Sequence, residues 1–299
     1  MNKKFNGTGV AVITPFHKDG SIDFRSFEKV INHLVNNGVN YIVALGTTGE
    51  STVLNIDEKN AVINFVTEIV EGKVPVVVGI GGNNTSEVLN SFQQISLDGV
   101  DAILSVCPYY NKPQQGGIYL HYKAIANSSP VPVILYNVPD RTGVNIKAET
   151  TLSLAHDFSN IIGIKEASKN YEQCVTILKN KPENFLLISG DDSSTLPLMA
   201  FGGNGVISVT ANAFPKEFSE MVNLCKKGDF KNARKIHYQL SDLTSSLFLE
   251  GSPGGVKAAM EILGLCQNYL RLPNVPVSRS TYNVIKTAVN NVISYSAVC

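Results

Sequence analysis

The chain has 299 residues, of which 43% are hydrophobic and 17% are charged, so it is long enough to bury a large core. Lysine plus arginine and aspartate plus glutamate both number 25, and the formal net charge is +0. This balance, without a run of basic residues, excludes the electrostatic footprint of a nucleic-acid-binding protein. No apolar run reaches the ~18 residues that a membrane helix needs.

Five cysteines are spread along the chain without a CxxC pair and without a histidine at metal-ligand spacing. We therefore expect neither disulfides nor a structural zinc site. The N-terminal MNKKF runs into a polar turn without the apolar segment of a secretory leader. Together these observations predict a soluble, reduced, cytoplasmic protein.

Eight short β-rich runs divide the first 210 residues, and they begin at intervals of 19 to 34 residues. This spacing is typical of strands that alternate with helices. The runs are almost continuously apolar, as in parallel strands that are covered on both faces. The predicted strands are TGVAVITPF from Thr8, YIVAL from Tyr41, PVVVGI from Pro75, AILSVC from Ala102, PVILYN from Pro132, IIGIKEA from Ile161, LLISGDD from Leu186 and GVISVT from Gly205.

Helical patterns with recognisable start signals lie between these runs. Asp23 precedes the first helix, and Gly38 after it suits a left-handed cap. The second predicted helix spans residues 55–70 and has two acidic residues in its first turn, where the helix dipole favours them. The third spans residues 85–97 and opens with TSEV, a candidate capping box.

Eight strand–helix units that close on themselves predict an α/β fold of the (β/α)8 TIM barrel type. An open doubly wound sheet shows the same alternation, but it usually carries GxGxxG after its first strand, where this chain has TPFHKDG. After Val209 only helical patterns follow, at residues 215–227, 230–249, 255–263 and 278–294. The sequence therefore predicts a catalytic barrel over residues 1–227 and a small C-terminal α-helical domain over residues 228–299.

The sixth run, IIGIKEAS, places a lysine and a glutamate in an otherwise apolar strand. Because strand side chains alternate between faces, Gly163, Lys165 and Ala167 share one face and Glu166 lies on the other. A lysine at a strand end usually extends into water. The alternative is a buried amine that is kept neutral enough to attack a carbonyl group. In that case Glu166 faces away from the amine and does not pair with it.

Polar residues also end other predicted strands, at the barrel face where active sites form. In GTTGES, two glycines flank Thr47 and Thr48, which suits a carboxylate site, although a tight turn explains the motif equally well. Tyr136 ends the inward face of the fifth run, one strand away from Lys165, and neighbouring strands are roughly 4.8 Å apart. Arg141 offers a planar fork of donors for a carboxylate. A half-buried tyrosine and a surface arginine are the alternatives for these two residues.

The motifs GTTGES, PYYNKP, YNVPDRTG, GIKEAS and SGDD occur in this order along the chain. Together they resemble the pyruvate-dependent class I aldolase and lyase superfamily, over essentially the whole chain, and within it the dihydrodipicolinate synthase family. The sibling N-acetylneuraminate lyases and 2-keto-3-deoxy sugar acid aldolases share the lysine, the tyrosine and a GTTGE-like turn. Arg141 and Tyr110 favour the synthases over these siblings.

The resemblance implies that Lys165 forms an imine with pyruvate, and that the derived enamine adds to L-aspartate 4-semialdehyde in the diaminopimelate route to lysine. No metal and no cofactor is implied. The implied catalytic residues are Lys165, Tyr136, Thr47 and Tyr110, of which the last three form a proton relay. The implied substrate-binding residues are Thr48, Arg141, Ile207 and Gly190.

The resemblance also implies an assembly and a regulatory site. We expect a homotetramer, a dimer of dimers, in which Tyr110 reaches the site of a neighbouring subunit. Ile56 and Lys59 stand where lysine-sensitive members often carry histidine or another aromatic residue, which argues against sensitivity of this chain. An inhibitory L-lysine site at the dimer interface matches Ser51, Thr52, Asn83, Glu87 and Tyr109.

Other polar and glycine-rich features have simpler explanations. GIGGNN and FGGNGV lack an adjacent lysine or arginine, so turn formation explains them better than phosphate binding. Asp191 and Asp192 lack a recognisable third metal ligand, and we expect them to be structural. A catalytically silent barrel with a regulatory or interaction role is the alternative to both enzyme hypotheses.

Overall fold

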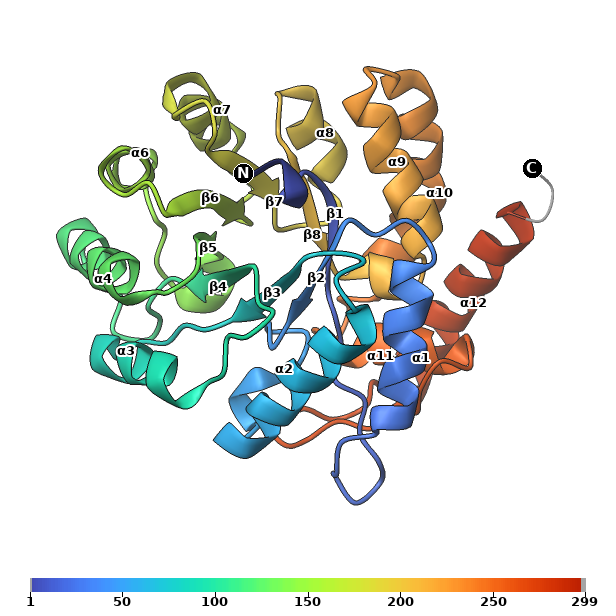
Figure 1. The fold of residues 1–299 in the computed structure, drawn as a ribbon. Helices are drawn as coiled ribbons and strands as arrows, with labels where there is room; N and C mark the ends of the chain where they lie inside the picture. The colour runs from blue at the N-terminus through green and yellow to red at the C-terminus, as the bar shows by residue number, and fades with distance from the viewer. Residues whose placement is uncertain (1, 297–299) are drawn as a thin grey trace.

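The computed structural model describes residues 2–296, and its centre is a closed barrel of eight parallel strands in sequence order (Figure 1). Strand β1 pairs with β8 through Gly7 and Gly205, which closes the sheet. The predicted (β/α)8 fold is therefore confirmed. The strands are β1 Gly7–Ala11, β2 Tyr41–Ala44, β3 Val76–Gly79, β4 Ala102–Val106, β5 Val133–Asn137, β6 Ile161–Glu166, β7 Leu186–Ser189 and β8 Gly205–Ser208.

Helices surround the barrel, and three more helices follow it along the chain (Figure 1). Each predicted strand is present, and all eight are shorter than the apolar runs that predicted them. The helices are α1 Phe24–Val35, α2 Ile56–Val70, α3 Thr85–Gln94, α4 Gln115–Ser128, α5 Pro139–Thr142, α6 Ala148–Asp157, α7 Tyr171–Asn180, α8 Thr195–Ala200, α9 Pro215–Lys226, α10 Phe230–Ser246, α11 Gly254–Ile262 and α12 Arg279–Ser296, with short 3₁₀ helices at Asn2–Phe5 (η1), Ser51–Val53 (η2) and Thr210–Asn212 (η3).

The start signal predicted for α1 is confirmed, and α2 begins one residue after its predicted start. Asp23 caps α1 by accepting from the Ser26 N–H at 3.0 Å. Asn55 caps α2 in a complete capping box with Glu58. Each such cap stabilises a helix by about 1 kcal/mol.

Helix α3 differs from its prediction at both ends. The TSEV box is wrong, because Asn84 is the capping residue and accepts from the Ser86 N–H at 3.1 Å. The helix ends at Gln94 instead of residue 97, because Asn60 of α2 binds both sides of this end. Its amide donates to the Gln94 carbonyl at 2.9 Å and its carbonyl accepts from the Ser96 N–H at 3.0 Å.

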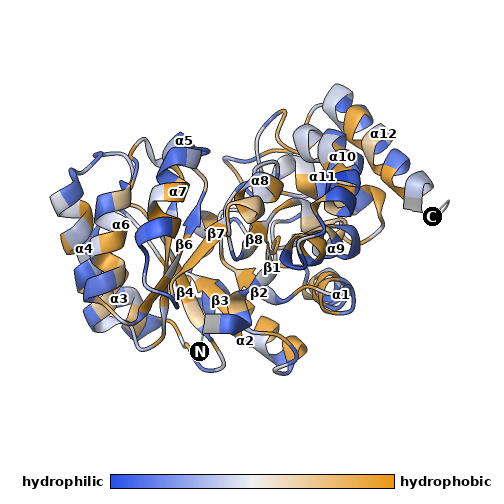
Figure 2. Ribbon diagram, turned by 90° about the horizontal axis from the view of Figure 1, so that it is seen from above, coloured by the Kyte–Doolittle hydropathy of each residue, from blue (hydrophilic) through white to orange (hydrophobic). Residues whose placement is uncertain are grey.

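The core has two layers, one inside the barrel and one between the strands and the helices. Figure 2 shows apolar residues concentrated on the strands and on the helix sides that face them. The inner layer is closed at the N-terminal end of the strands by Phe5 and Tyr41, whose rings meet edge to face at 5.6 Å. Both side chains are at most 1% exposed. The space inside the barrel therefore opens toward the C-terminal ends of the strands.

Helices α10, α11 and α12 lie together beside the barrel, next to α8, α9 and α1 (Figures 1 and 2). Helix α10 begins two residues after Gly228, which has a left-handed backbone with φ of +79°. We propose that the predicted boundary between residues 227 and 228 separates the barrel from the helical domain. Within residues 2–296, no helix combines the length and apolarity that crossing a bilayer requires.

The described cysteines are Cys107, Cys174, Cys225 and Cys266, and all are free and buried. Burial raises the pKa of the Cys107 thiol to about 12, so it stays protonated and behaves as a small apolar side chain. Cys299 lies outside the described residues.

His121 of α4 is a buried base that contacts Thr85 of α3. Its Nδ1 lies 2.9 Å from the Thr85 hydroxyl, and its Nε2 has no partner among the described residues. Burial lowers the pKa of this imidazole from 6.5 to about 4. Between these values the unfolded chain binds a proton that the folded chain does not, so folding is favoured more strongly as pH rises.

The stability that His121 contributes is therefore fully present above about pH 6.5 and is lost as pH falls toward 4. We expect His121→Asn, which retains a polar partner for Thr85, to remove about 2 kcal/mol of the stability difference between pH 7 and pH 5. Urea unfolding of both proteins at the two pH values measures this difference. An equal pH dependence of the unfolding free energy in both proteins would contradict its assignment to His121.

Candidate active site

A cavity of about 580 Å³ lies at the C-terminal ends of the strands and contains Lys165. The pairing of β5 with β6 places Tyr136 directly beside Lys165, as predicted. The Lys165 Nζ lies 4.2 Å from the centroid of the Tyr136 ring. The two side chains are 5% and 7% exposed, so the amine is largely removed from water but faces the cavity.

The Lys165 amine has no acidic partner among the residues that the structure describes. Within residues 2–296 its Nζ makes neither a hydrogen bond nor an ion pair. Glu166 lies on the opposite face of β6, where it is also buried. Its oxygens accept from the Asn137 amide at 3.0 Å, the Gln173 amide at 2.9 Å and the Ser168 N–H at 2.7 Å. The predicted separation of the amine from the carboxylate is present.

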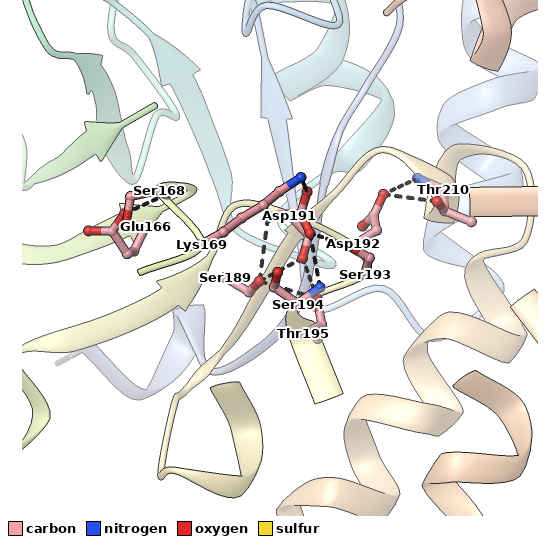
Figure 3. A network of polar contacts seen from close by, with 10 residues as sticks. All are labelled: Glu166, Ser168, Lys169, Ser189, Asp191, Asp192, Ser193, Ser194, Thr195 and Thr210. Carbon is pink, nitrogen blue, oxygen red and sulfur yellow. Dashed lines mark hydrogen bonds and ion pairs between the residues drawn. The ribbon is translucent and has the colours of Figure 1, made fainter. Parts of the chain in front are cut away.

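Figure 3 shows the polar contacts that follow β6 and β7. Asp191 accepts from the Lys169 ammonium at 3.3 Å and from the Ser194 N–H at 2.9 Å. Asp192 is buried and accepts from the N–H and the hydroxyl of Thr210 at 2.8 and 2.9 Å. Burial raises the pKa of Asp192. Among the described residues no group of acidic, histidine or cysteine side chains is arranged to hold a metal ion. Both aspartates therefore connect loops of the barrel.

The GTTGES turn forms one wall of the cavity. Thr47 is exposed and lines the cavity, whereas Thr48 is 4% exposed and does not line it. Within the described chain, the backbone N–H groups of Thr47 and Thr48 have no acceptor. Unpaired N–H groups next to a cavity suit a carboxylate group.

The structure brings some predicted residues to the cavity and leaves others away from it. Arg141, in the short helix α5, is exposed and lines the cavity. Ile207 is 1% exposed in the inner core layer and does not line the cavity. Tyr110 has a left-handed backbone with φ of +75°, is 84% exposed and does not line the cavity of its own chain.

Of the residues predicted to bind an effector, some line the cavity and others do not. Ser51, Thr52 and Tyr109 line the same cavity as Lys165. Asn83 and Glu87 are exposed and do not line it. Lys59 lines the cavity too, so it is the third cationic side chain around this space, after Lys165 and Arg141.

Sequence reasoning missed the contribution of the C-terminal region to the cavity. This region was predicted to pack beside the barrel, yet it also supplies part of the cavity wall. No local pattern marked these residues, because they lie outside the helices and carry no periodicity. They are Ser252, Pro253, Pro273 and Asn274.

The glycine-rich stretches are explained mainly by close packing. A Cβ on Gly79 would lie 2.2 Å from the Leu45 carbonyl oxygen, and one on Gly205 would lie 2.0 Å from the Gly7 carbonyl oxygen. Turn formation explains Gly202, whose φ is +103°. The expected turn chemistry is thus only part of the reason for GIGGNN and FGGNGV.

Known proteins resemble this chain over nearly its whole length. The sequence profile of the dihydrodipicolinate synthetase family matches residues 4–292. The 4-hydroxy-tetrahydrodipicolinate synthase of Parabacteroides distasonis is 51% identical over 280 residues, which cover 94% of each chain. This relative supports the predicted synthase and neither of the sibling lyases.

Two solved structures have the same fold. A structure described as the first monomeric dihydrodipicolinate synthase variant has a TM-score of 0.95 and 39% identity, over 97% of this chain and 98% of that chain. Dihydrodipicolinate synthase from Cyanidioschyzon merolae, with lysine bound, has a TM-score of 0.93 and 38% identity, over 97% of this chain and 98% of that chain.

Gly190, which follows β7, leaves space for Lys165. A Cβ at this position would lie 2.8 Å from the Ala167 Cβ and 3.1 Å from the Lys165 Cγ. We expect Gly190→Ala to displace the lysine and to slow the imine formation with pyruvate that the resemblance implies for it about 10- to 100-fold, with a loss of about 1–3 kcal/mol in stability. Adduct formation and thermal unfolding measure the two effects.

Gly116→Ala is the matched control for this substitution. Gly116 lies in α4, and a Cβ there would have no neighbour within 4 Å. This variant should react like the unsubstituted chain. Normal reactivity of Gly190→Ala would show that Lys165 tolerates the added methyl group.

Proposed function

This chain belongs to the dihydrodipicolinate synthetase family, and we propose that Lys165 carries out the reaction of a 4-hydroxy-tetrahydrodipicolinate synthase. In this reaction pyruvate condenses with L-aspartate 4-semialdehyde. The observation that carries the proposal is the buried Lys165 amine beside Tyr136, in a cavity where no carboxylate pairs with it. Such an amine is suited to attack a ketone.

The first half of the reaction binds pyruvate covalently. The Lys165 Nζ attacks the ketone carbon, and loss of water gives a protonated imine, which draws electrons from the adjacent methyl group. Removal of a methyl proton then gives an enamine. We assign to Tyr136, whose ring centroid lies 4.2 Å from the Lys165 Nζ, the donation of a proton to the departing oxygen and the uptake of one from carbon.

The second half joins the two substrates. The enamine carbon attacks the aldehyde carbon of the semialdehyde, whose oxygen takes up a proton. The amino group of the same substrate then attacks the imine carbon, closes the ring and releases the Lys165 amine. The product is a hydroxylated tetrahydrodipicolinate, and no electrons are gained or lost overall.

The other residues have supporting roles in the proposal. The free N–H groups of Thr47 and Thr48 hold the pyruvate carboxylate, and the exposed guanidinium of Arg141 holds the carboxylate of the semialdehyde. Ile207 supplies apolar packing beneath the site. Gly190 keeps the space that Lys165 needs.

We propose that a second copy of this chain completes the proton relay. Thr47 and Tyr136 share the cavity, but Tyr110 does not line it and is 84% exposed. Tyr109, its neighbour in the loop, is 37% exposed. Two exposed aromatic side chains on one loop favour a contact with another chain. A dimer is then the minimal working unit, and the homotetramer expected from the resemblance contains two such dimers.

The proposed regulation and location follow from side chains near and away from the cavity. An ammonium group at Lys59 disfavours a cationic effector beside Ser51, Thr52 and Tyr109, so we propose that L-lysine is a weak ligand of this chain. The free, buried cysteines suit a reducing compartment such as the cytoplasm.

Borohydride reduction in the presence of pyruvate tests the imine. We expect a mass increase on the peptide that contains Lys165, and none in Lys165→Met. Lys169→Met is the matched control, because Lys169 is an ion-paired surface lysine of the next loop. No adduct on Lys165 would favour a catalytically silent barrel. Turnover of N-acetylneuraminate or 2-keto-3-deoxygluconate, without turnover of the semialdehyde, would favour a sibling lyase.

Arg141→Ala separates the two substrates. Loss of a charged hydrogen bond should lower kcat/KM for the semialdehyde about 10- to 100-fold, while pyruvate adduct formation stays close to that of the unsubstituted chain. Steady-state kinetics and borohydride trapping measure the two steps. Arg234→Ala, at an exposed position of α10, is the control. Equal loss in both steps would contradict the role given to Arg141.

A further inference from the structure

A fully buried ion pair joins the GTTGES turn to the C-terminal helices. The Lys257 Nζ of α11 lies 2.6 Å from the Glu50 Oε1, and both side chains are 0% exposed. The same ammonium donates to the Tyr269 carbonyl at 2.8 Å and lies 4.2 Å from the centroid of the Phe16 ring. All three contacts hold the lysine in one position.

The second oxygen of Glu50 binds the segment that follows α11. Its Oε2 accepts from the Arg271 N–H at 3.2 Å and from the Asn274 amide at 3.3 Å. Asn274 and Pro273 of this segment line the cavity. Glu50 therefore connects three parts of the chain at the cavity wall.

The turn itself has an unfavourable backbone conformation. Leu45 and Glu50 stand on either side of GTTG, and both are left-handed, with φ of +56° and +54°. Residues with a Cβ adopt this conformation only where their surroundings enforce it. The Glu50 N–H donates to the Thr47 carbonyl at 3.1 Å, so the position of Glu50 also fixes Thr47.

A buried ion pair is rarely more stabilising than apolar residues of the same size, because both charges lose their water. Stability alone is therefore a weak explanation for this pair. Its location offers a better one, since Glu50 lies two residues after Thr48, whose N–H is free. Fixing the carboxylate of Glu50 fixes the turn that carries the unpaired N–H groups of Thr47, which lines the cavity, and Thr48, which follows it.

We infer that the Glu50–Lys257 ion pair positions the turn that carries Thr47 and Thr48 and thereby sets the affinity of the cavity for the keto acid. Glu50 lines the cavity, but its carboxylate is fully buried and bound to Lys257, so we assign both residues a positioning role. The inference rests on the proposed function for its ligand. The effect of the ion pair on the conformation of the turn does not depend on the ligand and can be measured on the ligand-free chain.

Three variants test the inference: Lys257→Met, Glu50→Gln and the double variant. Lys257→Met leaves a buried carboxylate without its counter-charge. We expect half-maximal borohydride trapping to require about 10-fold more pyruvate, a larger change than the fall in maximal trapping rate. Glu50→Gln keeps the shape of the side chain and an acceptor for Lys257, so it provides a milder variant where Lys257→Met folds poorly.

The double variant separates positioning from stability. It removes both charges, so its melting temperature should recover toward that of the unsubstituted chain. Its pyruvate requirement should stay raised, because methionine cannot donate to the residue at position 50. Recovery of both quantities together would overturn the inference and leave the pair a purely stabilising role.

Leu243→Ala is the control for loss of stability. Leu243 is 0% exposed in α10 and does not line the cavity, so this variant should melt at a lower temperature with an unchanged pyruvate requirement. A similar rise in the pyruvate requirement would overturn the inference, because it would attribute the effect to general destabilisation.

Hydrogen exchange of the ligand-free proteins gives a measurement that is independent of catalysis. Peptides covering residues 46–54 should exchange faster in Lys257→Met and in the double variant, and normally in Leu243→Ala. Unchanged exchange in Lys257→Met would overturn the inference. If the unsubstituted chain trapped no pyruvate, the proposed function would fail, and exchange would still decide whether the pair holds the turn.

Discussion

Each strand of the barrel sends alternate side chains inward and outward, and a slip of one residue in β6 would exchange Lys165 for Glu166. The closed sheet prevents such a slip, because β6 is paired with β5 on one side and with β7 on the other. The amine therefore faces the cavity beside Tyr136, and the carboxylate is held by amide and backbone donors on the outside. Two residues adjacent in sequence thus have opposite surroundings.

Features that depend on local pattern were predictable from the sequence. The alternation of inward and outward side chains along β5 and β6 predicted the positions of Tyr136 and Lys165, and Asp23 marked the start of α1. Features that depend on partners distant in the sequence were not predictable from the sequence. Asn60 of α2 decides where α3 ends, and Lys257 meets Glu50 across 207 residues of sequence. A single sequence contains no local signal for contacts of this kind.

The C-terminal region is more closely connected to the site than its helical pattern indicated. Arg271 binds Glu58 in the first turn of α2 and the carbonyl groups of Gly20 and Val53, while Lys257 binds Glu50. These anchors converge on the turn after β2 and the helix that follows it. Packing beside the barrel was foreseen from the helix count, whereas this convergence required the three-dimensional arrangement.

Phe5 and Tyr41 close the N-terminal end of the barrel. This closure determines where small molecules enter and leave the site. In the proposed reaction both reactants arrive, and the product leaves, through the opening at the other end. Lys165 is at the inner end of that passage, whereas Arg141 is near its rim. For the proposed reaction we therefore expect the smaller reactant to be in place before the larger one occupies the passage, so that geometry sets the order of arrival.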